Sequence, residues 1–295
     1  MLKQIALCAA MFVAVTGAHA EDTPAAASDF DSSIMVTLLD MKAPTADRHT
    51  ALAALKQHAE AGNSFAMYDL GSLVHQTRFK DDAVIRPDPG AALMWLTRAF
   101  DNGRFTAAFK LATVHRELGD HLEAMAWLQV YTYYWKGGNR TAQRSLPTSG
   151  AAAWLMARLQ AELKSVPEES IRQRTIALLE AHGTKFEQAP ATPSDSAEGC
   201  DVRPPPKGFR FDGSRRHDPS IVELVARIAP DGSASESFVM DSVPDPMAAK
   251  MARQFAFAIR CPEVSADSPE RHAFILFNYR GTDPYRSRGR ESRSE

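Results

Sequence analysis

Hydrophobic and polar positions in the last third of the chain follow the order strand, strand, helix, strand. Residues 221–229 and 235–240 have the period-two pattern of strands, and the turn Pro230-Asp231-Gly232 between them supplies the positive φ that a tight hairpin requires. An amphipathic helix is expected after Pro246, and the apolar residues 273–279 predict a third long strand. The order predicts a small mixed ββαβ domain.

The first half of the chain resembles itself at a spacing near 40 residues. Aligning residues 55–62 with 96–103 brings Ala66 opposite Ala107 and Leu70 opposite Leu111. A second match pairs Asp88, Ala92, Trp95 and Leu96 with Asp120, Ala124, Trp127 and Leu128. This period predicts an α-helical repeat solenoid, in which small residues lie where helices approach closely and Gly62 and Gly103 separate the helices. The fold class is therefore expected to be α+β.

Two further helices are expected to cap the solenoid. One covers residues 151–163, and the next follows Ser165, which forms a capping box with Glu168, and ends at Gly183. Residues 184–199 are rich in Ala, Pro, Ser and Thr and are expected to be a linker. The expected organisation is a signal peptide over 1–20, an extension over 21–48, helical repeats over 49–183, the linker, a ββαβ domain over 200–280, and a disordered Arg-rich tail over 281–295.

The N-terminus and the cysteines predict an oxidising compartment. Lys3, the apolar residues 5–17 and Ala18-His19-Ala20 have the pattern of a cleavable signal peptide, whereas an uncleaved anchor needs about 20 apolar residues. Cleavage would remove Cys8 and leave Cys200 and Cys261, which we expect to form a disulfide. The alternative is a redox-active pair, but such pairs are typically C-x-x-C. The protein is thus expected to be periplasmic or secreted.

Composition and motifs disfavour catalysis, cofactors and nucleic-acid binding. The formal net charge of −2 gives no general attraction to nucleic acid, and the chain contains no P-loop, dinucleotide fingerprint, HExxH, C-x-x-C or G-x-S-x-G. A metal site made of His115, Glu117, His121 and Glu123 is not expected either, because Gly119-Asp120 separates the two histidines. We therefore expect a protein that is not an enzyme, with no catalytic residues, no metal and no cofactor.

The last quarter of the chain resembles the C-terminal domain of the TonB family. The pattern V-E-L-V-A-R-I-A-P-D-G-S-A, then V-M-D-S-V-P-D-P, an Ala-rich helix ending near Arg260-Cys261-Pro262, and F-I-L-F-N-Y carry the resemblance. It implies a small sheet packed on helices that recruits partners at an exposed sheet edge. The last strand then offers Phe274, Leu276 and Asn278 as partner-binding candidates. The same edge could instead form a homodimer or be covered by residues 204–211.

The helical half resembles Sel1-like repeats, a tetratricopeptide-like family. The pattern A-x-x-W-x-x-x-A, then G, then A-x-x-x-L, occurs as A-L-M-W-L-T-R-A over residues 92–99, then Gly103, then A-A-F-K-L over 107–111. The resemblance implies a protein-binding scaffold without catalysis.

An aromatic run in this half is a second candidate surface for binding a partner. Tyr131, Tyr133, Tyr134 and Trp135 could anchor a peptide, or alternate rings could pack into the last repeat. Taken together, the sequence predicts an exported adaptor that binds periplasmic or outer-membrane protein partners. The alternative is a soluble TonB-related component of outer-membrane transport that engages receptors by β-strand addition.

Overall fold

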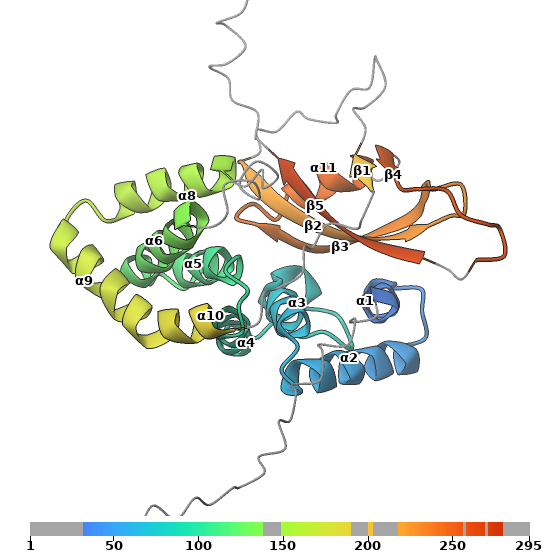
Figure 1. The fold of residues 1–295 in the computed structure, drawn as a ribbon, viewed down its shortest axis with the longest axis horizontal. Helices are drawn as coiled ribbons and strands as arrows, with labels where there is room; N and C mark the ends of the chain where they lie inside the picture. The colour runs from blue at the N-terminus through green and yellow to red at the C-terminus, as the bar shows by residue number, and fades with distance from the viewer. Residues whose placement is uncertain are drawn as a thin grey trace, which may run out of the picture.

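The fold is a layer of helices packed on a small antiparallel sheet, which confirms the α+β class (Figure 1). The computed structural model describes residues 32–137, 149–189, 200–202, 218–255, 258–268 and 271–279. The predictions for the signal peptide, for residues 190–199, for residues 204–211 and for the tail after residue 280 lie outside the described residues.

The helices pack in sequential pairs. They are α1 (Ser32–Leu39), α2 (Thr45–Glu60), α3 (Ser64–His75), the short η1 (Thr77–Phe79), α4 (Pro89–Asp101), α5 (Ala107–Glu117), α6 (His121–Gly137), α8 (Ser149–Glu162), α9 (Glu168–Leu178), the π-turn η2 (Leu179–Gly183) and α10 (Thr184–Gln188). Gly62, Gly103 and Gly119 have φ of 99°, 91° and 84°, so each ends its helix in the left-handed conformation that glycine favours. Ala66 and Ala107, which the repeat alignment brings opposite each other, are both fully buried.

The end of the helical half differs from the prediction in two respects. Helix α9 begins after Pro167 with no side-chain cap, so the expected capping box between Ser165 and Glu168 is wrong. Gly183 does not end the helix, because it keeps a helical φ of −58° and the chain continues through α10 to Gln188. A Cβ at Gly183 would lie 2.9 Å from Oη of Tyr134. This glycine therefore allows a close approach to α6, and the helical part extends into the expected linker.

Helix α1 lies inside the expected N-terminal extension and contributes to the core. Its apolar side chains Met35, Val36, Leu38 and Leu39 are buried. The Arg48 side chain fixes its end, since Nε donates to the carbonyl oxygen of Leu38 at 2.9 Å and the guanidinium pairs with Asp82 at 2.7 Å. Residues 32–39 are thus part of the fold.

The sheet contains β2 (Ser220–Ile228), β3 (Ala234–Val243) and β5 (Arg271–Tyr279) in the antiparallel order β3-β2-β5. These strands and α11 (Ala248–Phe255) follow the predicted ββαβ order. A second ribbon pairs β1 (Asp201–Val202) with β4 (Ile259–Arg260). Cys200 and Cys261 flank this ribbon in register and form the predicted disulfide, with their Cα atoms 4.0 Å apart.

The hairpin turn places a glycine where no other residue fits. Gly232 has φ of 76°, and a Cβ there would lie 2.0 Å from the carbonyl oxygen of Cys261. The Cys261 N–H donates to the carbonyl oxygen of Gly232 at 2.8 Å, so the turn rests directly on the disulfide-linked ribbon. Gly232 is required both for its backbone conformation and for this close contact.

The two faces of β2 enter different cores. Ile221 and Val225 belong to the large core of the helices, whereas Val222, Leu224 and Ala226 pack with α11 and the disulfide-linked ribbon. Alternation along the strand thus puts the sheet between the helical layer and α11, as Figure 1 shows. The helical half and the sheet are therefore parts of one packed structure.

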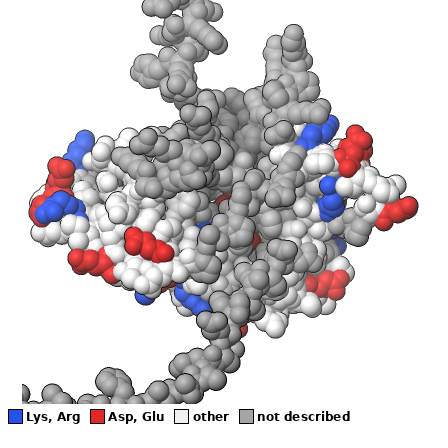
Figure 2. Space-filling view, viewed as in Figure 1, with Lys and Arg blue, Asp and Glu red and all other residues white. Residues whose placement is uncertain are grey.

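Two further properties concern the helices and the surface charge. No helix in the described part of the chain is long and apolar enough to cross a membrane. On the face shown in Figure 2, the described acidic and basic residues are interspersed, in keeping with the small net charge.

Candidate partner-binding edge and the buried charged contact beneath it

A buried lysine joins the helical layer to the sheet. Lys110 lies in α5 with its side chain 1% exposed, and its Nζ contacts Glu223 of β2 and, at 2.5 Å, Asp241 of β3. Nζ also donates to Oγ of Ser72 in α3 at 2.6 Å. Glu223 and Asp241 are opposite each other in the register of β2 and β3, so one cation from a helix bridges two neighbouring strands.

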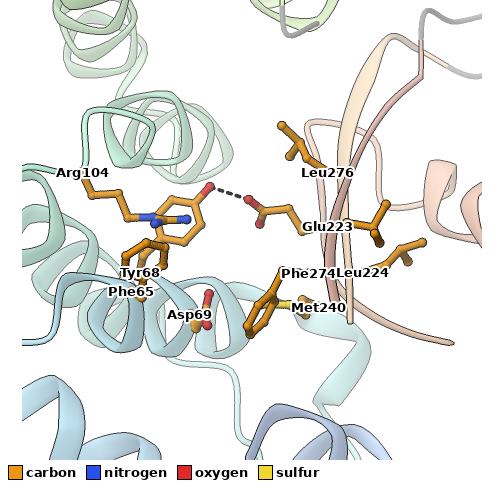
Figure 3. Close-up of a pocket in the computed structure, with 10 residues that line it drawn as sticks. Phe65, Tyr68, Asp69, Arg104, Glu223, Leu224, Met240, Phe274 and Leu276 are labelled. Atoms are coloured by element: carbon orange, nitrogen blue, oxygen red, sulfur yellow. Dashed lines mark hydrogen bonds between the residues drawn. The ribbon is translucent and has the colours of Figure 1, made fainter. Parts of the chain in front are cut away.

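Polar groups of α3, of Gln76 directly after it, and of β3 complete this contact. The Tyr68 hydroxyl donates to Glu223 at 2.7 Å, as the dashed line in Figure 3 marks, and the Gln76 amide donates to Asp241. The backbone N–H of Ser242 also donates to Asp241, at 2.7 Å. Lys110 and Tyr68 come from the helices and Gln76 directly follows α3, so the cluster specifies how the helices sit on the sheet.

The protonation states follow from this packing. Burial lowers the pKa of Lys110, but the charges of Asp241 and Glu223 outweigh burial and raise it above its usual value. Burial raises the pKa of Tyr68 well above its usual value, and the negative charge of Glu223 raises it further. Lys110 is therefore charged and Tyr68 neutral near pH 7. Both act as hydrogen-bond donors, and neither is poised to exchange a proton in that range.

The β3 edge of the sheet is covered at its centre by Arg78. The register slips between Leu224 and Glu223, which leaves Met240 as an extra residue in β3. The Arg78 guanidinium donates to the carbonyl oxygens of Val239 and, at 2.8 Å, of Met240. Burial lowers the pKa of Arg78 to about 10, against the opposing effect of Asp241, so it remains charged near pH 7.

The opposite edge is formed by β5, where the sequence placed three partner-binding candidates. Phe274 and Leu276 are opposite Val225 and Glu223 and share the sheet face that packs on the helices, and the backbone of Asn278 is opposite Ile221. Phe274 and Leu276 are half-buried against the helical core, and Asn278 is placed by its register alone. Among the described strands β5 has one neighbour, β2.

A cavity of about 40 Å³ separates this part of the sheet from the helices (Figure 3). Phe65 and Tyr68 of α3 and Arg104 line it on the helical side, and side chains of all three long strands line it on the other. The Arg104 guanidinium lies 4.3 Å from the ring centre of Phe65 and 4.1 Å from that of Tyr68. The half-buried members of the lining include Phe65, Phe274 and Leu276, so the open side is near β5.

The aromatic run of α6 does not form one surface. Tyr131 is buried and stacks on Phe105 at 5.9 Å between ring centres, and Trp135 packs beside it. Tyr134 packs against Phe186, and burial, followed by the charge of Glu187, raises its pKa to about 12. Only Tyr133 among these four is strongly exposed, at 56%. It remains the candidate of this run for contact with a partner.

The four residues considered as metal ligands each have a separate partner. Glu117 pairs with His75 at 2.8 Å, Glu123 with Arg174 at 2.8 Å, and His121 with Glu162 at 3.9 Å, while His115 lies 3.6 Å from Asp120. Across the part of the chain that the structure describes, no group of three or more His, Cys, Asp or Glu is arranged to hold a metal ion.

The pair His75 and Glu117 predicts a pH dependence of stability. Burial lowers the pKa of His75, but the hydrogen bond that His75 donates to Glu117 and the charge of Asp241 outweigh burial and raise this pKa above 6.5. Because the folded protein binds the His75 proton more tightly than the unfolded chain does, protonated His75 stabilises the fold below pH 6.5. This contribution is lost as the pH rises through the raised pKa of His75. Glu117→Gln should therefore lower the free energy of unfolding more at pH 5.5 than at pH 8.5, as measured by urea denaturation. An equal loss at both pH values would contradict this. Because the Glu117 side chain is 41% exposed, the effect should be modest.

Comparison with protein-family models, curated proteins and solved structures finds no match to this chain. The fold and the site therefore define the class only: an α+β protein whose helical layer is joined to a three-stranded sheet by a buried charged contact. The sequence interpretation missed Lys110, Glu223 and Asp241. The available signal was a charged residue inside each of three apolar segments, A-A-F-K-L-A, I-V-E-L-V and V-M-D-S-V.

Proposed function

We propose that this protein is an exported adaptor that binds other proteins and carries out no chemistry of its own. The observation that carries the proposal is the difference between the two edges of the sheet. Arg78 occupies carbonyl groups at the centre of the β3 edge, whereas the β5 edge has no second strand neighbour in the described part of the chain. Backbone groups on such an edge bind an extended segment by β-strand addition.

The location and the second surface rest on separate observations. A disulfide between Cys200 and Cys261 is typical of proteins outside the cytoplasm, which supports export to the periplasm or beyond. Tyr133 offers an exposed aromatic ring on the helical half, the type of residue that anchors interfaces. Residues 275–279 and Tyr133 are therefore the two proposed contact points.

Site-specific photo-crosslinking in intact cells tests this proposal. A photoreactive phenylalanine analogue is placed at Asn278 or at Tyr133, and a matched control carries it at Ile176, an exposed apolar residue of α9. We expect protein adducts from positions 278 and 133 and none from position 176. An outer-membrane receptor in the 278 adduct would assign the protein to transport, and a self-adduct would indicate a homodimer. Absence of adducts at both positions would refute the adaptor proposal.

A further inference from the structure

The cavity beside β5 has a size that selects a particular kind of side chain. A site of this kind needs about 10–15 Å³ to hold one water molecule, so about 40 Å³ has room for roughly three heavy atoms. The branched end of valine or leucine fits this room, and an indole or phenyl ring exceeds it. The lining is mainly apolar, and on the side of the sheet its apolar side chains are those of Met240, Phe274 and Leu276. Leu224 and Ile275 border the cavity too, but they belong to the core on the other face of the sheet.

The charges around the cavity balance one another. Asp69 and Glu223 contribute two negative charges, and Arg104 contributes one positive charge from the lining. Lys110 contributes a second positive charge, but it is shared between Glu223 and a third carboxylate, Asp241. The third positive charge comes from Arg78, which interacts electrostatically with Asp241. A charged group entering the cavity would lose hydration without meeting an excess of opposite charge, which is costly in a buried site. The cavity is therefore complementary to an uncharged occupant.

The position of the cavity connects it with the edge of the sheet. Leu276 lies in β5 and lines the cavity with its half-buried side chain. In a strand added beside β5, the residue directly opposite Leu276 would point to the same face, because paired residues of neighbouring strands share a face. That residue would be directed toward the open side of the cavity, next to Leu276.

We propose that this cavity is a specificity pocket that receives one small aliphatic side chain of a partner strand added to β5. The inference rests on the proposed function, because the strand must first pair with β5. Backbone hydrogen bonds then supply affinity for any extended segment, and the pocket selects valine, isoleucine or leucine opposite Leu276. Aromatic and charged residues at that position are disfavoured, the former by size and the latter by desolvation.

Four synthetic peptides that differ at one position test the pocket. The probes have the sequence Lys-Thr-Thr-X-Thr-Thr-Lys, with blocked ends and with X as Val, Leu, Trp or Glu. Each is titrated into the ¹⁵N-labelled full chain, and the amide signals of residues 275–279 are followed by NMR. We expect the Val and Leu peptides to bind at least about ten-fold more tightly than the Trp and Glu peptides, the size of discrimination that a close-fitting apolar pocket gives.

A variant of the pocket provides the second measurement. Leu276→Trp places a ring at the cavity and should remove the preference for Val over Trp, whereas the matched control Leu276→Met should keep it. If the Leu276→Trp variant does not fold, the relative affinities of the four peptides for the unchanged protein are sufficient to test the pocket. Equal binding of all four peptides at β5 would overturn the pocket and leave strand addition in place. Failure of every peptide to shift the β5 amides would overturn the pocket and count against strand addition as well.

Discussion

Replacing Lys110 with methionine is expected to lower the free energy of unfolding by about 3–5 kcal/mol. The substitution leaves Glu223 and Asp241 buried without their shared cation, since their side chains are 12% and 0% exposed. Methionine fills similar space and adds no polar group. The decrease in the free energy of unfolding therefore measures the cost of burying the two carboxylates without their cation. Urea denaturation followed by circular dichroism at pH 7 measures it.

The control is another lysine that pairs with a carboxylate at the surface. Lys42 lies 3.8 Å from Glu236 with its side chain 86% exposed, and Lys42→Met should change stability by less than about 0.5 kcal/mol. Adding Glu223→Gln and Asp241→Asn to Lys110→Met removes both uncompensated charges and should recover most of the loss. A Lys110→Met protein as stable as the unchanged one would show that the cluster does not hold the helices on the sheet.

The cluster also constrains how the two parts fit together. An apolar interface alone tolerates small shifts, but Lys110 meets Glu223, Asp241 and Ser72 together in one position only. Tyr68 in α3 and Gln76, the residue directly after α3, also bind these carboxylates and impose the same geometric requirement. We interpret the buried charges as selecting one orientation of the helices on the sheet, at some cost in stability relative to an apolar contact. That orientation sets the cavity next to β5.

The local elements were predictable from the sequence because their patterns are local. The turn at Asp231-Gly232 separates two strands with period-two alternation, and β2 and β5 begin within two residues of the predicted positions. Gly62 and Gly103 end helices as expected, because a left-handed φ favours glycine wherever it occurs. Gly183 was misread, since a glycine also serves close packing and sequence alone does not separate the two uses.

The candidate site was less predictable, because it depends on which parts of the chain cover one another. Alternation in β2 places Glu223 on the same face as Ile221 and Val225, but it does not say what lies over that face. A glutamate in a strand is usually solvated, and so is a lysine in a helix such as α5. Only the packing of α3 and α5 on the sheet shows that Glu223 and Lys110 are buried together. Contacts between segments 113 residues apart carry no local signal.

Replacing Cys200 and Cys261 together with alanine is expected to lower the free energy of unfolding by about 4 kcal/mol. The disulfide closes a loop between residues 61 apart in sequence, and its loss returns that conformational freedom to the unfolded chain. In the folded protein the two cysteines pack against the core that includes Val222 and Ile259. The loss should therefore be accompanied by faster hydrogen exchange in α11 and β4, while the α5 and α6 amides change less.

The single variants Cys200→Ala and Cys261→Ala are the matched controls, and each should lose as much stability as the double variant, because each removes the same bridge. Reducing agent should destabilise the unchanged protein by the same amount as the double substitution and have no further effect on the double variant. The destabilisation should also reach the β2–β3 hairpin, because the Cys261 N–H donates a hydrogen bond to the carbonyl oxygen of Gly232 in its turn. Titratable thiols at Cys200 and Cys261 in the exported protein, or equal stability with and without reductant, would contradict both the bridge and the inferred compartment.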